Sequence, residues 1–195
     1  MNNFKIFKDG WVGDDTVCGW GSRMENTLNI RQDLPDICRS IQRGDCVKLN
    51  DAGCGDLWWW KNLNIPLVDY VGYDMFPKSS WDELPYDTRQ LNLCEQDMRS
   101  CDIILCRDVF IHWPNEFILQ ALERFRKVGT WLYSTSYTGE YFEFDNNDHI
   151  TDFSMHHSKL NLCSPPFDLG IPRAFTAENY ENGHSRKVMC LWKLK

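Results

Sequence analysis

The most restrictive feature of the sequence is the run 102–106, Asp-Ile-Ile-Leu-Cys, in which apolar side chains occupy successive positions. A strand that is apolar on both faces is typical of the centre of a parallel sheet, because helices cover both faces of such a sheet. Other short strand-like runs lie on either side of it, at 47–52, 69–74, 88–94 and 131–136. Strands that alternate with helical connections predict an α/β fold with a Rossmann-like, doubly wound sheet.

Apolar residues at helical spacing predict helices at 25–42 and 115–127, and Pro35 within the first predicts a kink or a division. Residues 57–63, which include three consecutive tryptophans, are expected to form a short helix. At the end of the chain, the runs 173–176 and 187–194 predict an antiparallel hairpin that closes the sheet.

The length of 195 residues is that of a single domain. Within the domain 1–195, we expect residues 1–45 to form an N-terminal cap and helical segment. The polar stretch 138–170 is expected to be an insertion or a lid over the acceptor site.

Composition narrows the functional classes. A net charge of −7 argues against a protein that is held on nucleic acid by bulk electrostatics. No apolar run approaches the ~20 residues of a membrane span, so no membrane partner and a cytoplasmic location are expected. The nine cysteines are an odd number without a secretory signal, which predicts free thiols. They show no paired spacing typical of zinc, so no metal site is expected.

The chemistry-bearing residues follow the predicted strands. The first strand ends in Asp51-Ala-Gly-Cys-Gly-Asp, where Gly53 and Gly55 let the backbone approach a ligand closely. The second strand ends in Asp74, which lies 19 residues after Gly55. A carboxylate in this place can accept hydrogen bonds from both ribose hydroxyls of a nucleoside.

Two phosphate-binding motifs are missing around this turn. The third glycine of a nicotinamide-dinucleotide fingerprint would stand at position 58, which is tryptophan. The Gly-Lys-Ser of a nucleotide-binding phosphate loop is also missing. The pattern therefore favours a nucleoside without phosphates, and S-adenosylmethionine fits that description.

Three segments carry a resemblance to a known family. Residues 49–56 resemble the first motif of class I S-adenosylmethionine-dependent methyltransferases, and 71–75 resemble the second. Residues 102–113 are similar to the fourth-strand motif and the helix that follows it. Gly-Trp-Gly-Ser at 19–22 and Thr-Leu-Asn-Ile-Arg-Gln-Asp-Leu-Pro at 27–35 are similar to segments of small bacterial and phage-type members, whose acceptor is unassigned.

The resemblance implies S-adenosylmethionine as cofactor and S-adenosylhomocysteine as product, in a single methyltransferase domain. It implies that Asp51, Gly53 and Gly55 line the methionine and ribose parts of the cofactor. Asp74 would hold the ribose hydroxyls, and Met75 would pack on the adenine.

The resemblance also implies contacts from later strands and from the N-terminal segment. Asn92, with the Leu93 amide beside it, would contact the adenine amino group. Arg107 would border the cofactor after the fourth strand. The segment 20–27, including Trp20 and Gly21, would close over the methionine end.

Methyl transfer is an in-line displacement, for which an enzyme supplies mainly orientation and, where the acceptor needs it, a base. Asp108 and His112 are the candidates for acceptor-side catalysis, because residues four apart share a face if the chain is helical there. Arg-Asp-Val-Phe at 107–110 replaces the Asn/Asp-Pro-Pro-Tyr signature of amino-methylating DNA enzymes. Methylation of a base amino group is therefore not favoured.

A small-molecule acceptor is the first hypothesis, with an aromatic wall formed by Trp58, Trp59, Trp60, Trp113 and Tyr137. Two alternatives stay open. The first is a nucleic-acid-modifying enzyme that uses the same cofactor through basic residues near the C-terminus (Arg173, Arg186, Lys187, Lys193 and Lys195). The second is a non-catalytic cofactor-binding or regulatory module. The oligomeric state is left open.

Overall fold

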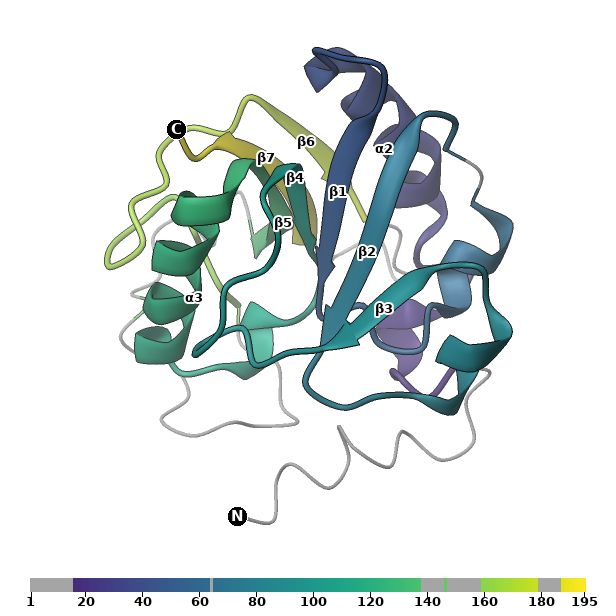
Figure 1. Ribbon diagram of the computed structural model, residues 1–195. Coiled ribbons are helices and arrows are strands. Elements are labelled where there is room, and N and C mark those ends of the chain that lie inside the picture. The colour runs from purple at the N-terminus through teal and green to yellow at the C-terminus, as the bar shows by residue number, and fades with distance from the viewer. Residues whose placement is uncertain (1–15, 64, 138–145, 147–158, 179–186) are drawn as a thin grey trace.

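A seven-stranded sheet with the strand order β3-β2-β1-β4-β5-β7-β6 forms the centre of the protein (Figure 1). The computed structural model describes residues 16–63, 65–137, 146, 159–178 and 187–195. The strands are β1 Val47–Ala52, β2 Val68–Asp74, β3 Asp87–Gln90, β4 Cys101–Cys106, β5 Gly129–Tyr137, β6 Ala174–Ala177 and β7 Lys187–Lys193. Strands β1 to β5 pair in parallel, and β7 runs antiparallel to both neighbours. The predicted doubly wound sheet with a C-terminal antiparallel hairpin is confirmed.

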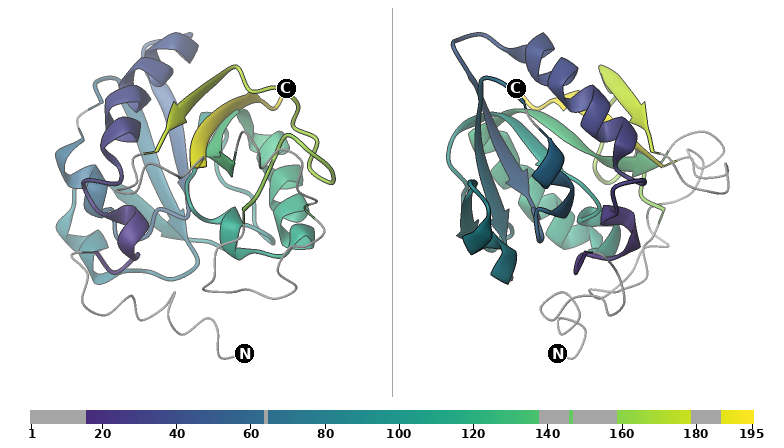
Figure 2. Two further views of the ribbon diagram at one scale, coloured as in Figure 1. Left: turned by 180° about the vertical axis from the view of Figure 1, so that it is seen from behind. Right: turned by 90° about the vertical axis from the view of Figure 1, so that its right-hand side faces the viewer.

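In the described part of the chain, two α-helices cover opposite faces of the sheet. Helix α3 (Asn115–Val128) lies in front of the sheet in Figure 1, and α2 (Leu28–Ile41) lies in front in the reverse view of Figure 2. Strand β4 divides its side chains between them: Ile103 and Leu105 join the core cluster on the α2 side, whereas the next residue after each joins the α3 side. This two-sided burial explains the apolar run from which the sheet was predicted.

The crossover connections are mostly turns and short 3₁₀ helices, among them the short helix expected at 57–63. Among the described connections between parallel strands, only the one from β4 to β5 contains an α-helix. The tryptophan run forms a short 3₁₀ helix, η2 (Trp58–Asn62), and the next connection contains η3 (Ser79–Glu83). Prolines at 66, 77 and 85 explain this, because proline lacks the amide donor that a helix interior needs. Pro35, in contrast, lies within a continuous α2.

The helix expected directly after the fourth strand is also interrupted. Residues 107–109 are irregular, η4 (Phe110–His112) is a single 3₁₀ turn, and α3 begins only at Asn115. Asp108 has a φ of 54°, in the left-handed region that side-chain-bearing residues rarely adopt. The chain therefore turns sharply where the sheet edge begins.

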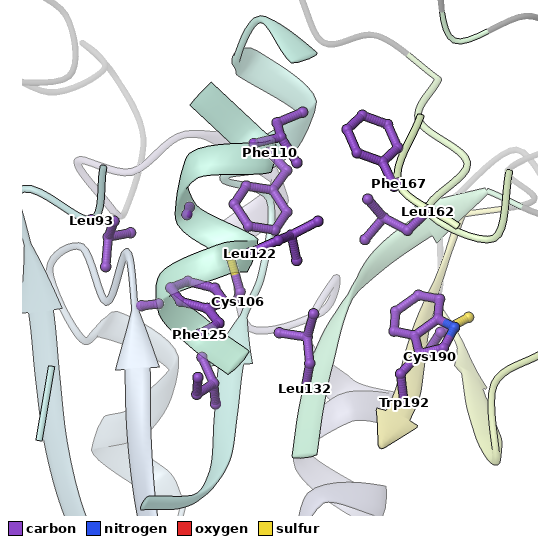
Figure 3. Packing of buried hydrophobic residues seen from close by; sticks show 14 of the residues in the cluster. Leu93, Cys106, Phe110, Leu122, Phe125, Leu132, Leu162, Phe167, Cys190 and Trp192 are labelled. Carbon is purple, nitrogen blue, oxygen red and sulfur yellow. The ribbon is translucent and has the colours of Figure 1, made fainter. Parts of the chain in front are cut away.

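Part of the predicted lid belongs to the core. Figure 3 shows Leu162 and Phe167 near Phe110 and Leu132, within the cluster that α3 covers. The buried Asn146 side chain donates hydrogen bonds to the carbonyls of Asn161 (2.9 Å) and Pro165 (2.8 Å). Residues 138–145 and 147–158 of that stretch, and 1–15 of the N-terminal segment, lie outside the described residues.

In the described part of the chain, no helix is both long enough and apolar enough for a bilayer span.

Candidate functional site

The carboxyl ends of β1 to β4 form the edge where the predicted site residues meet. From β1 the chain proceeds outward to β2 and β3, and then returns to β4 on the other side of β1. Ligands of doubly wound sheets bind at such a switch point. The segments 53–56, 74–75, 92–93 and 107–108 follow these four parallel strands, so the fold brings them to one edge.

Both glycines of the turn after β1 are required by conformation and by contact. Gly53 and Gly55 have φ values of 84° and 58°. A Cβ atom at position 53 would overlap Val109 Cγ2, and one at position 55 would overlap Cys18 Sγ. The turn is therefore packed between the segment after β4 and the N-terminal segment.

The amides of residues 53–58 all donate hydrogen bonds within the chain. Their acceptors, in chain order, are the Tyr73 carbonyl twice (2.7 and 3.1 Å), Asp74 Oδ2 (3.1 Å), Cys18 Sγ (3.2 Å), the Cys54 carbonyl (3.3 Å) and Asp56 Oδ1 (3.0 Å). A phosphate cradle needs backbone amides that point at the ligand. This turn does not offer them, in agreement with the missing phosphate motifs.

Asp74 lies half-buried at the end of β2, beside the turn. Its Oδ2 accepts the Gly55 amide, and its Oδ1 accepts the Phe76 amide at 2.9 Å. Burial raises the pKa of Asp74, while the backbone donors oppose that rise. A carboxylate oxygen can accept more than one hydrogen bond, so the fixed carboxylate retains capacity for two hydroxyl donors.

The two predicted adenine-side segments flank Asp74. Met75 is half-buried, and its carbonyl accepts Gln90 Nε2 at 3.1 Å. Asn92, two residues past the end of β3, accepts the Cys94 amide on its Oδ1 at 3.0 Å, and Leu93 is buried. Their positions at the β2 and β3 ends place both segments along one side of the turn.

Asp51 has a different environment. Its Oδ2 accepts Trp60 Nε1 at 2.8 Å and the Tyr70 hydroxyl at 3.0 Å, and only 3% of the residue is exposed. Burial raises the pKa of this carboxyl to about 7. The partners that the structure gives to Asp51 are thus core aromatic side chains on the α2 face.

The predicted aromatic wall is divided between the two faces of the sheet. Trp59 and Trp60 are buried in the cluster on the α2 side, where Trp60 packs on Tyr70 with ring centroids 4.4 Å apart. Trp113 and Tyr137 belong to the cluster on the α3 side. These residues therefore do not share one wall.

Asp56 is a site residue that the sequence reasoning missed. Its Oδ2 accepts the Thr16 hydroxyl at 2.6 Å and the Val17 amide at 2.8 Å, which fastens the N-terminal segment to the glycine turn. Its place directly after Gly55 was the available signal. From η3, the side chains of Ser80 and Trp81 donate hydrogen bonds to the carbonyls of Asp56 (2.8 Å) and Gly55 (2.7 Å). No sequence motif predicted these contacts.

Four charged side chains form a cluster after β4, here called the buried quartet: Arg107, Asp108, Glu178 and Lys187. Lys187 Nζ lies 2.7 Å from both Asp108 oxygens and 2.7 Å from Glu178 Oε2. Arg107 lies 3.2 Å from Glu178 Oε1 and 3.3 Å from Asp108 Oδ2. Side-chain exposure is 17% for Asp108 and at most 4% for the others. Glu178 was not predicted as a site residue, and Lys187 was named only in the basic cluster of the nucleic-acid alternative, whereas the structure buries it among these carboxylates.

The quartet decides the protonation state of Asp108. Burial alone would raise the pKa of this carboxyl, but Arg107 and Lys187 hold it well below its usual range. Such a carboxylate is a weak base. His112 is half-buried and close enough to lower the pKa of Asp108 further, but the left-handed turn at Asp108 means that the two residues do not share a helical face.

The predicted N-terminal residues lie against the quartet. Trp20 and Gly21 belong to the 3₁₀ turn η1 (Trp20–Ser22), in which Trp20 is 38% exposed. The Gly21 carbonyl accepts Arg107 Nη2 at 2.8 Å, and a Cβ atom at position 21 would lie 2.9 Å from Asp108 Oδ2. The N-terminal segment thus bridges the glycine turn and the end of β4.

Metal-binding geometry is not found in the described residues, which contain no group of three His, Cys, Asp or Glu side chains arranged to hold an ion.

Comparison with known proteins gives a match at the level of structure alone. No family model and no curated protein matches the chain. Magnesium protoporphyrin IX methyltransferase (ChlM) from Synechocystis PCC 6803 with bound SAH has a TM-score of 0.59 at 14% identity, over 97% of this chain and 91% of that one. The methyltransferase SibL has a TM-score of 0.57 at 12% identity, over 86% of this chain. Mitomycin 7-O-methyltransferase MmcR has a TM-score of 0.58 at 10% identity, over 84% of this chain.

The lengths of these structures differ. The chain spans 55% of SibL and 53% of MmcR, but most of ChlM. All three similarities are to the overall fold, with TM-scores of 0.57 to 0.59. The protein therefore has the fold of the class I S-adenosylmethionine-dependent methyltransferases.

Proposed function

We propose that the protein is an S-adenosylmethionine-dependent methyltransferase that acts on a small-molecule acceptor. The observation that carries the proposal is the pairing of Asp74 with the glycine turn. The turn fixes the carboxylate through the Gly55 amide, and its own amides are used within the chain. An edge of this kind suits a ribose without phosphates.

The residues present fit this cofactor. Asp74 would hold the ribose hydroxyls, Met75 and Leu93 would border the adenine, and Asn92 would contact its amino group. Gly53 and Gly55 would contact the methionine and ribose parts. Asp51, which is buried near the end of β1, would support the turn. The similar structures of ChlM contain SAM or SAH, which supports the choice.

When bound, this cofactor supplies a methyl group activated on a sulfonium. We propose that the chain contributes mainly orientation. Arg107 holds the Gly21 carbonyl, so that Trp20 and Gly21 would close over the methionine end. Asp108 is ionised and engaged with Lys187, so we assign it a positioning role and leave His112 as the candidate base.

The acceptor class is proposed from two considerations. The similar structures include enzymes named for magnesium protoporphyrin IX and for mitomycin, both small molecules. The net charge of −7 disfavours a polyanionic acceptor.

Calorimetric titration of SAM and of SAH into the wild-type protein and into Asp74→Ala tests the proposal. We expect binding to the wild type and a loss of at least about ten-fold in the variant, because the ribose hydroxyls lose a charged acceptor. Asp82→Ala, which removes an exposed carboxylate from η3, is the matched control and should bind like the wild type. Failure of the folded wild type to bind either ligand would refute the proposal.

A further inference from the structure

The buried quartet lies directly beside the glycine turn. Val109, the residue after Asp108, packs on Gly53. Gly21, which covers Asp108, accepts a hydrogen bond from Arg107. The field of Arg107 also reaches the Asp51 carboxyl at the end of β1, whose pKa it lowers. The charges of the quartet therefore act on the edge at which the cofactor's methionine end is proposed to lie.

The quartet contains two cations and two anions among the described residues, and the chain assembles them from distant positions. Arg107 and Asp108 follow β4. Glu178 and Lys187 face each other at the end of the C-terminal hairpin where the segment that connects β6 to β7 begins and ends, and the Glu178 amide donates to the Lys187 carbonyl at 3.2 Å. The Glu178 side chain has no exposure, and Arg107 and Lys187 compensate its charge in the interior.

From this geometry we propose that the charge balance of the buried quartet maintains the preference of the site for the charged cofactor over its neutral product, with Glu178 and Lys187 as a matched pair of opposite charges whose separate loss shifts that preference in opposite directions. The inference rests on the proposed function. SAM and SAH differ at the sulfur, which is a cationic sulfonium in the first and a neutral thioether in the second.

The charge balance predicts the direction in which each substitution changes the SAM/SAH affinity ratio. Removal of the Glu178 charge makes the local field one unit more positive, which opposes the sulfonium and leaves the thioether unaffected. Removal of the Lys187 charge has the opposite effect. At an effective dielectric constant of about 20, a unit charge about 12 Å away shifts a binding equilibrium on the order of ten-fold.

The test is calorimetric titration of SAM and of SAH, at fixed ionic strength, into the wild type, Glu178→Gln, Lys187→Met and the double variant. The readout is the ratio of the two affinities. We expect Glu178→Gln to lower the SAM/SAH affinity ratio on the order of ten-fold and Lys187→Met to raise it. The double variant, which is balanced again, should return the ratio to within about two-fold of the wild type.

A purely structural role would weaken both ligands equally, so an unchanged ratio in both single variants overturns the inference. If Glu178→Gln does not fold, Asp108→Asn removes the same sign of charge from the more exposed member and must lower the ratio in its place. Absence of binding of both ligands to the wild type overturns the proposed function, and this inference with it. If the wild type binds both SAM and SAH and neither single variant changes the affinity ratio, only the inference is overturned.

Discussion

Asp51 lies near the end of β1 and Asp108 follows the neighbouring strand β4, and although desolvation acts on both carboxyls, their surroundings shift their pKa values in opposite directions. Asp51 meets neutral donors from Trp60 and Tyr70, so desolvation dominates and raises its pKa to about 7. Asp108 meets the cations Arg107 and Lys187, which outweigh desolvation and lower its pKa. The partner, more than the depth of burial, determines which protonation state each site prefers.

The pH dependence of stability should therefore contain a falling component from Asp51. The unfolded chain releases this proton near its ordinary value of 3.8 and the folded chain only at about 7. Between these values the unfolded state binds fewer protons, so the free energy of unfolding falls as pH rises from about 4 to about 7. Asp51→Asn keeps an acceptor for both donors, and it should remove this slope and stabilise the protein by about 1–3 kcal/mol at pH 8. Urea unfolding at several pH values measures both effects.

Asp108 should contribute to the pH dependence of stability in the opposite direction to Asp51. Its folded-state pKa is lowered, so its contribution is present above about pH 4 and is lost as pH falls below that value. Asp108→Asn should leave the slope from pH 4 to 7 unchanged. A variant of Asp51 whose pH profile matches that of the wild type would contradict the assignment.

The positive φ of Gly53 and its contact with Val109 predict the effect of a side chain at position 53. Gly53→Ala introduces a Cβ at a φ of 84° and into Val109 Cγ2, so it should lower the free energy of unfolding by about 2 kcal/mol or more. Val109→Ala in the same chain removes the overlap but not the backbone strain. The double variant should recover part of the loss in denaturant unfolding, and a strictly additive loss would show that the contact is unimportant.

At the scale of elements, the strands were predicted better than the connections. The ends of β1, β2 and β4 agree with prediction to within one residue, because each is a short apolar run bounded by turn residues. Strand β3 ends at Gln90, although Leu91 and Leu93, which lie beyond it in the predicted run 88–94, are buried. The apolar connections contain prolines, and apolar periodicity alone does not separate a 3₁₀ turn from a helix.

The candidate site divides in the same way. Segments that follow a strand, such as the glycine turn and Asp74, were found because the strand ends fix their place. Glu178 and Lys187 were not placed at this edge from the sequence, since they lie 71 and 79 residues away from Arg107 and Asp108, the partners that they meet. Only the pairing of the hairpin beside β5 brings them to the edge. Local sequence does not contain that information.

The N-terminal segment should depend on Asp56 for its attachment. Asp56→Ala removes the acceptor of the Thr16 hydroxyl and of the Val17 amide. We expect faster amide hydrogen exchange across residues 16–22, on the order of ten-fold or more, with unchanged protection in β4 and β5. Asp45→Ala, at an exposed position before β1, is the control. Equal exchange in Asp56→Ala and the control would show that the segment is held by other contacts.

For the molecule as a whole, the nine cysteines report on packing. All nine are free thiols, and Cys46 alone is exposed, whereas the other eight are half-buried or buried. The native protein should therefore show one fast-reacting thiol with a neutral alkylating reagent, and Cys46→Ser should abolish it. In denaturant all nine should react. A smaller number under denaturing, non-reducing conditions would show that a disulfide is present.

The antiparallel seventh strand has a consequence for the order of synthesis. Because β7 lies between β5 and β6, β6 has no place in the sheet until residues 187–193 have left the ribosome. The same strand delivers Lys187 to Asp108. A nascent chain that ends before β7 holds the glycine turn, Asp74 and Arg107, but not a complete quartet. The edge proposed to receive the cofactor is thus completed by a strand that is translated after β1 to β6.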